Sequence, residues 1–219
     1  MRVVKLTPEN LGQIVEEAAG VLRSEGVILY PTDTLYGLGA DAFSDDAIAK
    51  IHSIKGRDES KPIHCVVTDL SMAGKYGEFN ETARRLAKEF FPGALTLVVE
   101  KKEGIKSGIA RDIETIGFRI PRNDFCIALA HTFEKPYTTT SANVSGEVSE
   151  RSIKEVLAQL GTSAEEIGLI IDAGTLPPSA PSTVVGVSGE DAVILREGAI
   201  PTTEIFESLG QLLPERENL

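Results

Sequence analysis

The sequence lacks several features that would assign it to a specialised class of protein. It contains no tryptophan and only two cysteines, Cys65 and Cys126, and aromatic residues make up only 5% of the chain. Two cysteines are too few for a disulfide framework, so we expect two buried thiols in a reducing compartment. No apolar run approaches the roughly 20 residues that cross a bilayer, and the N-terminus lacks the apolar segment of a secretory signal. We therefore expect a soluble, cytoplasmic protein.

Positive charge is also scarce. The chain has 22 Lys and Arg residues against 33 Asp and Glu residues, which gives a formal net charge of −11 at pH 7. A protein that holds nucleic acid by itself usually presents a basic surface that releases counterions from phosphate. The acidic total argues against stable nucleic-acid binding. It leaves room for a local basic cluster, because net charge does not describe a single cleft.

Common catalytic motifs are absent as well. The chain contains neither the GxxxxGK[ST] pattern of a P-loop nor the GxSxG pattern of a nucleophile elbow. GLGADA at 37–42 carries only the first two glycines of a dinucleotide fingerprint. The histidines are scattered, and the adjacent His64 and Cys65 would point to opposite faces of a strand. No zinc site is therefore predicted.

Helical and strand patterns alternate along the 219 residues. Capping residues and helical apolar spacing predict helices at about 8–25, 44–55, 81–91, 125–131 and 153–160. Short apolar or β-branched runs predict strands at 27–30, 63–67, 95–99, 115–121, 138–143, 169–172, 183–187 and 192–196. This order predicts an α/β fold with a single open twisted mixed sheet and helices on its faces, the last two strands being antiparallel.

We expect one domain over residues 7–210 and a polar C-terminal tail at 211–219. GTLPPSAPST at 174–183 has the composition of either a linker or a structured loop. The predicted strands on both sides favour a loop over one domain.

Small polar groups follow the β-branched run of TTTSANVSG at 138–146. Ser141 and Asn143 either close a turn through local side-chain bonds or present a hydroxyl and an amide to a ligand. Lys55 and Arg57, separated by Gly56, follow a predicted helix and either compensate its dipole or bind an anion. Arg119 and Arg196 lie at predicted strand ends, where a cleft could collect cations that suit a triphosphate.

Six ordered motifs resemble one known family. They are YPTDTLYGLGADAF at 30–43, KGR at 55–57, FRIP at 118–121, TSAN at 140–143, PSTVV at 181–185 and LREG at 195–198. Their order and spacing resemble the YrdC/YciO/TsaC family of threonylcarbamoyl-AMP synthases over about residues 7–210. The resemblance implies a YrdC-like sheet with a deep concave cleft, in the short, single-domain form.

The resemblance also implies an activity. Members condense L-threonine, bicarbonate and ATP into L-threonylcarbamoyladenylate and pyrophosphate, with Mg²⁺ assisting. The product supplies the threonylcarbamoyl group placed on adenosine 37 of tRNAs that read codons beginning with A. The tRNA threonylcarbamoyltransferase machinery would receive it. All reactants carry anionic groups, so we expect catalysis by orientation and electrostatics, without a covalent nucleophile or a protein-held metal.

The resemblance assigns roles residue by residue. Lys55 and Arg57 are the catalytic pair. The implied nucleotide contacts are Lys55, Arg57, Thr115, Ser141, Asn143, Ser149 and Arg196. The implied threonine contacts are Thr32, His64, Arg119, Thr139 and Ser182, with the fork of Arg119 on the carboxylate. Taken singly, Thr32, Thr115 and Thr139 fit a structural role in a strand or turn equally well.

Three positions near these motifs leave alternatives open. Tyr36 lines the cleft or is a core aromatic. His64 lies in KPIHCVV, where many longer relatives read NPLIVHV and have their histidine at the place of Val66. Asp33 replaces a glutamate of many relatives and shortens the reach of the carboxylate.

Two other functions fit the same features. A YciO-like paralogue, or a carbamoyl-transfer domain of hydrogenase maturation, would keep the fold and change the substrate. An RNA-binding module would use the cationic cleft for RNA backbone. The acidic total and the few aromatics count against RNA.

Overall fold

A single ten-stranded mixed sheet organises the computed structural model, which describes residues 1–56, 61–189 and 191–211. The strand order is β1-β8-β2-β3-β7-β4-β6-β5-β9-β10. The strands are β1 (Arg2–Lys5), β2 (Val27–Pro31), β3 (Tyr36–Gly39), β4 (His64–Val66), β5 (Leu95–Glu100), β6 (Thr115–Arg119), β7 (Tyr137–Ser141), β8 (Ile167–Asp172), β9 (Thr183–Ser188) and β10 (Asp191–Arg196). β9 and β10 pair antiparallel. The predicted α/β class and mixed sheet are confirmed.

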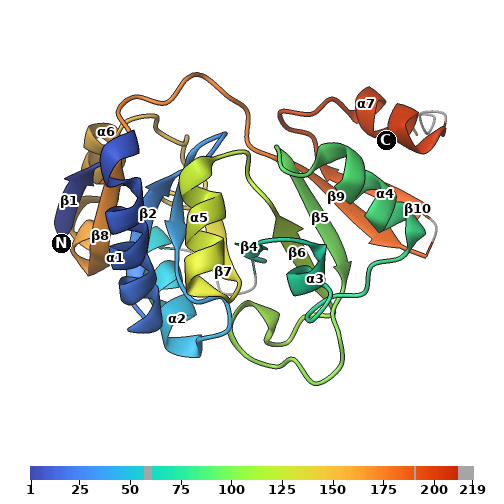
Figure 1. The fold of residues 1–219 in the computed structure, drawn as a ribbon, viewed down its shortest axis with the longest axis horizontal. Coiled ribbons are helices and arrows are strands. Elements are labelled where there is room, and N and C mark those ends of the chain that lie inside the picture. Colours follow the sequence, from blue (N-terminus) through green and yellow to red (C-terminus); the bar gives the residue numbers. More distant parts are fainter. Residues whose placement is uncertain (57–60, 190, 212–219) are drawn as a thin grey trace.

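The described residues contain seven α-helices, of which six lie between strands and α7 follows the last strand (Figure 1). They are α1 (Leu11–Arg23), α2 (Asp45–Lys55), α3 (Leu70–Ala73), α4 (Glu81–Phe90), α5 (Asp124–Phe133), α6 (Ile153–Leu160) and α7 (Thr202–Leu209). Side-chain caps begin several of them: Ser44 accepts from the N–H of Ala47, and Ser152 from that of Glu155. The predicted caps of α2 and α6 are therefore confirmed. Three short 3₁₀ turns lie at Pro8–Asn10, Gly108–Ala110 and Gly161–Glu166.

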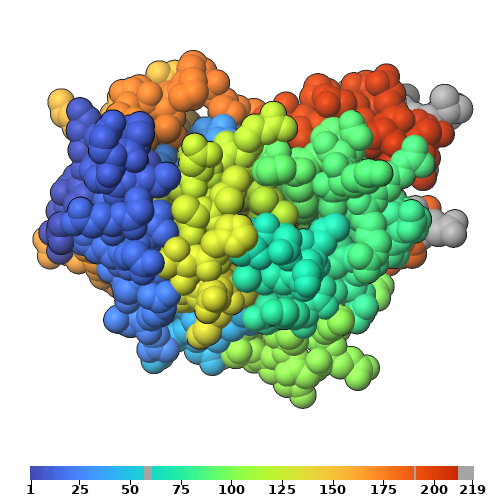
Figure 2. All heavy atoms as spheres, viewed as in Figure 1, coloured from blue at the N-terminus to red at the C-terminus, as the bar shows by residue number. Residues whose placement is uncertain are grey.

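Two apolar cores cover opposite faces of the sheet. On β2, Val27 and Leu29 join the core packed by α2, α4, α6 and α7, whereas Ile28 and Tyr30 join the core packed by α1 and α5. This alternation follows from the two-residue period of a strand. Figure 1 shows α1 and α5 side by side over the N-terminal part of the sheet, and Figure 2 shows their side chains, blue and yellow, forming one continuous surface.

In the described part of the chain, no helix covers the second face over β5, β9 and β10, and this area is called the bare face here. The core of α1 and α5 extends only over the other half of the sheet. On β5, Leu95, Leu97 and Val99 are buried in the first core, so the alternate residues point to the bare face. Val193 and Leu195 of β10 are 56% and 58% exposed there. The bare face leaves room for a cleft along the middle of the sheet.

Local sequence signals missed four elements. β1, β3, α3 and α7 were not predicted, and β3 is the least expected of them. Its two glycines explain this. A Cβ on Gly39 would lie 2.9 Å from atoms of both Ile28 and Tyr30, so the glycine lets β3 pack closely on β2, although glycine normally argues against a strand.

The two cysteines are as expected from the sequence. Cys65 and Cys126 are buried free thiols and form no disulfide. The segment 174–183 connects β8 and β9 of the one sheet, so it is a loop over a single domain. In the described residues no helix has the length and apolar character needed to cross a membrane. Residues 212–219 of the expected tail lie outside the described residues.

Candidate active site

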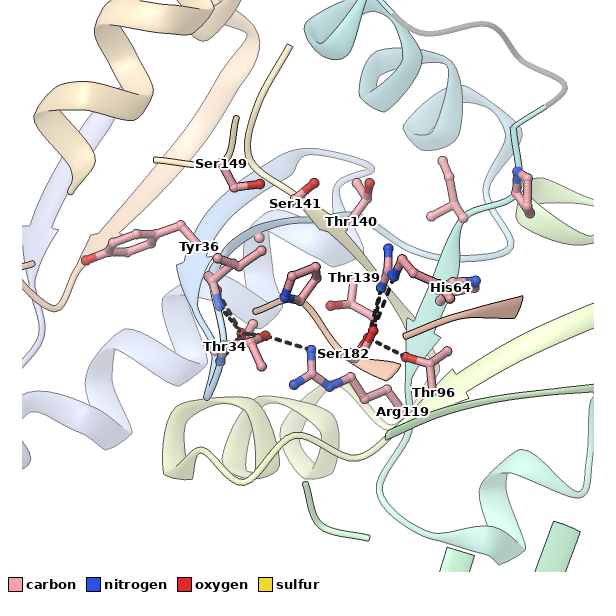
Figure 3. Close-up of a pocket in the computed structure, with 17 residues that line it drawn as sticks. Thr34, Tyr36, His64, Thr96, Arg119, Thr139, Thr140, Ser141, Ser149 and Ser182 are labelled. Carbon is pink, nitrogen blue, oxygen red and sulfur yellow. Dashed lines mark hydrogen bonds between the residues drawn. The ribbon is translucent and has the colours of Figure 1, made fainter. Parts of the chain in front are cut away.

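A cleft of about 280 Å³ opens at the bare face and lies across the middle of the sheet (Figure 3). Hydroxyl groups and two arginines dominate its walls. Eight of the predicted site residues line it: Thr32, His64, Arg119, Thr139, Ser141, Ser149, Ser182 and Arg196. They come from segments more than 160 residues apart in sequence, which the strand order brings together.

The turn after β2 forms one wall. The Thr32 hydroxyl donates to the Leu35 carbonyl at 2.7 Å and accepts from the N–H groups of Thr34 and Leu35, each at 3.1 Å. The hydroxyl therefore closes its own turn, in the manner typical of Thr and Ser. This geometry fits the structural alternative stated for Thr32, while its side chain still borders the cleft.

Arg119 forms the floor at the end of β6 and is only 4% exposed. Its guanidinium donates to the carbonyl of Gly93 at 3.3 Å, the hydroxyl of Thr34 at 3.0 Å and the carboxylate of Asp33 at 2.5 Å. The other oxygen of Asp33 accepts from the backbone N–H of Arg122. Of the five guanidinium N–H groups, two have no acceptor in the described part of the chain and are left for a ligand.

A second guanidinium lies on the opposite rim. Arg196 donates from Nε and Nη2 to the Ser182 carbonyl at 3.2 and 2.8 Å, and from Nη2 to the Ser182 hydroxyl at 3.2 Å. That hydroxyl also bonds Thr96 at 2.8 Å. Burial, and after it repulsion from Arg119, lowers the pKa of Arg196. Two cations that repel each other across a small cleft favour an anion between them.

Lys55 and Asn143 lie behind the wall. The ammonium of Lys55 donates to the carbonyls of Ser141 and Asn143 and to Asn143 Oδ1, and the side chain is 1% exposed. Asn143 in turn donates to the carbonyls of Val144 and Glu147 at 3.0 and 2.6 Å. Neither Lys55 nor Asn143 lines the cleft, whereas Ser141 does.

The remaining predicted residues differ in placement. His64 pairs in register with Thr139 across β4 and β7, and both line the cleft. Thr115 lies at the far end of β6, in a separate hollow with Val98 and Leu195. Arg57 lies outside the described residues.

Sequence reasoning missed three cleft threonines, Thr34, Thr96 and Thr140. Thr140 stands in the TSAN motif but was not predicted as a ligand contact. Thr34 stands in the PTDT motif, so its neighbourhood was available as a signal. Thr96 is a single polar residue inside the strand LTLVVE, and nothing in that local pattern separates it from an ordinary strand threonine. Tyr36 combines both alternatives given for it: it borders the cleft, and it is buried with its hydroxyl bonded to Gly174 and Ala173.

The sheet and cleft together define a class: a single-domain α/β protein of YrdC-like fold with a polar cleft on a partly bare sheet. The Sua5/YciO/YrdC family model, described as "Telomere recombination", matches residues 20–198. A protein of Methanocaldococcus jannaschii, named a putative threonylcarbamoyl-AMP synthase, is 31% identical over 94% of this chain and 95% of its own length. The chain belongs to this family.

Longer relatives match over part of their length. The threonylcarbamoyl-AMP synthase of Pyrococcus abyssi is 34% identical over 93% of this chain, which spans 61% of that protein. The structure of P. abyssi Sua5 complexed with L-threonine superposes with a TM-score of 0.89 at 30% identity, over 97% of this chain and 62% of that one. Escherichia coli YciO superposes with a TM-score of 0.81 at 26% identity, over 94% and 98%.

Proposed function

We propose that the protein is an L-threonylcarbamoyladenylate synthase. In the first step the amine of L-threonine captures bicarbonate as a carbamate, and water is released. A carbamate oxygen then attacks the α-phosphorus of ATP, the bond to the β-phosphate breaks, and pyrophosphate leaves. The adenylate would pass to the machinery that modifies adenosine 37 of tRNAs reading codons that begin with A. The proposal rests on relatives that carry this name at 31–34% identity.

The observation that carries the proposal is the pair of guanidiniums on opposite sides of one small cleft, surrounded by hydroxyls. L-Threonine carries a carboxylate and ATP carries phosphates, and forked donors suit both groups. A volume of about 280 Å³ is slightly below the range typical of small-molecule sites, roughly 300–1,000 Å³. It suits the amino acid and the reacting groups, with the rest of the nucleotide extending along the sheet.

The residues divide the task as follows. Arg119, fixed by Asp33 and Thr34, binds the threonine carboxylate with its two remaining N–H groups. Thr139, Ser182 and His64 surround the rest of the amino acid. The nucleotide contacts proposed at the cleft are Ser141, Ser149 and Arg196. Thr115, in the separate hollow, and Arg57, outside the described residues, are proposed from the resemblance alone. Catalysis then comes from holding carbamate and α-phosphorus in line and stabilising the added charge.

Magnesium fits this site only together with the triphosphate. In the described residues there is no group of three or more His, Cys, Asp or Glu side chains placed to hold a metal ion. Asp33, beside Arg119, is already ion-paired. Mg²⁺ commonly keeps several waters and binds through substrate phosphates. Bound in that way, it would neutralise charge on the departing pyrophosphate.

Pyrophosphate release from ATP tests the proposal. We expect release only when L-threonine and bicarbonate are both present, with the adenylate detected by mass. Arg119→Lys should lower kcat/KM for L-threonine at least tenfold, because an ammonium cannot reproduce the forked contacts. Arg122→Lys is the matched control, since Arg122 lies at the protein surface and its side chain donates only to the Pro92 carbonyl among the described residues. An equal rate of pyrophosphate release from ATP with and without L-threonine would exclude this function.

A YciO-like activity on another substrate is the second candidate, because the chain matches E. coli YciO over almost the full length of both. The same assay separates the two. Binding of ATP without any L-threonine-dependent product, under conditions that support a bona fide synthase, would favour the paralogue.

A further inference from the structure

We propose that Lys55 is a positioning residue: its buried ammonium fixes the Ser141–Asn143 turn so that Ser141 presents only acceptor lone pairs to the cleft. Ser141 would then recognise an O–H or N–H donor of the substrates, and not a phosphate oxygen. The identity of those substrates rests on the proposed function. The arrangement of the turn does not.

The end of α2 directs Lys55 inward. Gly56 follows it at φ 53°, a left-handed conformation that glycine adopts readily and that ends the helix. The Lys55 carbonyl then accepts from the Ser145 N–H at 2.9 Å. The backbone of Lys55 therefore contacts the segment after the turn, and its side chain contacts the turn itself.

The ammonium of Lys55 contacts the turn at three points among the described residues. It donates to the carbonyls of Ser141 and Asn143 and to the side-chain oxygen of Asn143. Burying an ammonium is costly unless its donors are paired. Lys55 is 1% exposed and does not line the cleft, and the turn oxygens help to stabilise its buried charge.

The hydrogen-bond directions follow from Asn143. Its Nδ2 donates to two carbonyls, of Val144 and Glu147. That fixes the amide orientation, because a flipped amide would place its oxygen against both carbonyls. Oδ1 consequently faces Lys55 and Ser141, and since an amide oxygen has no hydrogen, the Ser141 hydroxyl must donate to it.

Ser141 has then used its single hydrogen. Only the lone pairs of its oxygen are left to face the cleft. An unprotonated phosphate oxygen is also an acceptor, so the two oxygens could not form a hydrogen bond and would repel each other. A ribose hydroxyl of the nucleotide or the amine of the amino acid offers the required donor. The phosphates would be left to the guanidiniums.

Binding measurements distinguish these roles without turnover. Calorimetry would give Kd values for ATP, 2′-deoxy-ATP, 3′-deoxy-ATP, inorganic pyrophosphate and L-threonine, with wild type, Ser141→Ala and Lys55→Met. Lys50→Met is the control, because Lys50 lies on the same helix and donates outward to Glu25. We expect Ser141→Ala and Lys55→Met to change the pyrophosphate Kd less than threefold and to weaken ATP or L-threonine about five- to thirtyfold.

The analogues identify the donor. If a ribose hydroxyl is the partner, one deoxy nucleotide should lose affinity in wild type and lose nothing further in Ser141→Ala. If the amine is the partner, the loss appears for L-threonine alone. The effects of Lys55→Met and Ser141→Ala should also be non-additive, because one acts through the other.

Two results would overturn the inference: a tenfold or greater loss of pyrophosphate affinity in Ser141→Ala or Lys55→Met, or additive effects of the two. General loosening of the fold would weaken all ligands alike and would also count against it. If Lys55→Met does not fold, the Ser141→Ala profile alone decides the donor assignment. A wild type that binds these ligands but makes no adenylate refutes the proposed function and leaves this inference standing.

Discussion

At the scale of single residues, Tyr36 connects the cleft to the loop between β8 and β9. Its ring is buried, and its hydroxyl donates to the Gly174 carbonyl at 2.7 Å and accepts from the Ala173 N–H at 3.0 Å. The loop that begins there runs on to Ser182 on the cleft rim. Tyr36 therefore anchors the start of a segment whose far end borders the ligand site.

Alkaline titration reports on this anchor. Burial raises the pKa of Tyr36 to about 12, from an ordinary value near 10. The folded state holds this proton more tightly, so the associated stability is complete below pH 10 and is lost as pH rises towards 12. We expect Tyr36→Phe to cost about 1 kcal/mol at pH 8 and to reduce the alkaline loss, as measured by urea unfolding at pH 8 and 11. Burial also raises the pKa values of Tyr30 and Tyr137, so part of the alkaline loss in the free energy of unfolding should remain in Tyr36→Phe. A loss equal to that of the wild type would contradict the prediction.

The residue scale also shows what sequence can and cannot supply. Strand-end positions correctly placed Arg119, Ser141 and Arg196 around one cleft. Tertiary contacts set the direction of a long side chain at a helix end, so the sequence did not indicate that Lys55 at the end of α2 lies behind the wall of the cleft. Ligand binding by these residues stays a prediction.

At the scale of elements, Thr138 joins β7 to β3. Its hydroxyl donates to the Leu38 carbonyl at 3.1 Å and accepts from the Ala40 N–H at 2.9 Å. Thr138→Val keeps the shape and leaves both backbone groups without this partner, so we expect a loss of about 1–3 kcal/mol in the free energy of unfolding. Thr115→Val, at an exposed strand position, should change it by no more than about 0.5 kcal/mol. Equal effects in urea denaturation would refute a special role for Thr138.

β6 makes room for His64 through a glycine. A Cβ at Gly117 would lie 2.3 Å from the Cδ2 atom of His64. Gly117→Ala should therefore displace the imidazole, shift its NMR resonances and cost about 1–3 kcal/mol. Gly186→Ala is a matched control on β9, because its new Cβ would meet only the movable end of the Leu195 side chain, at 3.2 Å. If the His64 resonances do not move in Gly117→Ala, the packing is not as described.

Elements with strong local signals were predicted well, and the others were not. α2 and α6 have capping serines and regular apolar spacing, and both were found from sequence. β3 contains YGLG, whose glycines are suited to close packing on β2, and that requirement is visible only once the neighbouring strand is in place.

At the scale of the whole molecule, charge and the bare sheet face act together. A hollow of about 1,110 Å³ includes the exposed apolar side chains of β10. Five carboxylates and one cation, Lys101, line it; the carboxylates belong to Glu78, Glu100, Glu103, Glu114 and Asp191. An exposed apolar edge strand favours association, and an excess of charge of one sign opposes it.

Salt tests this balance. Raising NaCl to about 1 M shortens the screening length to roughly 3 Å, so we expect reversible self-association, seen as increased light scattering. Leu195→Lys should abolish the increase, whereas Val148→Lys, at an exposed residue of a loop outside this hollow, should not. Scattering that is independent of salt would show that the bare face has no tendency to associate.

The three-residue strand β4 joins the two halves of the sheet, since β7 and β6 pair with it and not with each other. The cleft straddles this narrow join: Thr34 and Tyr36 lie on one side, and Thr96 and Arg196 on the other. A ligand bound there would contact both halves of the sheet and stabilise their junction at β4. Ligand binding should therefore slow the hydrogen exchange of the β4 amides more than that of other amides, because separation of the two halves at β4 would first require the ligand to dissociate.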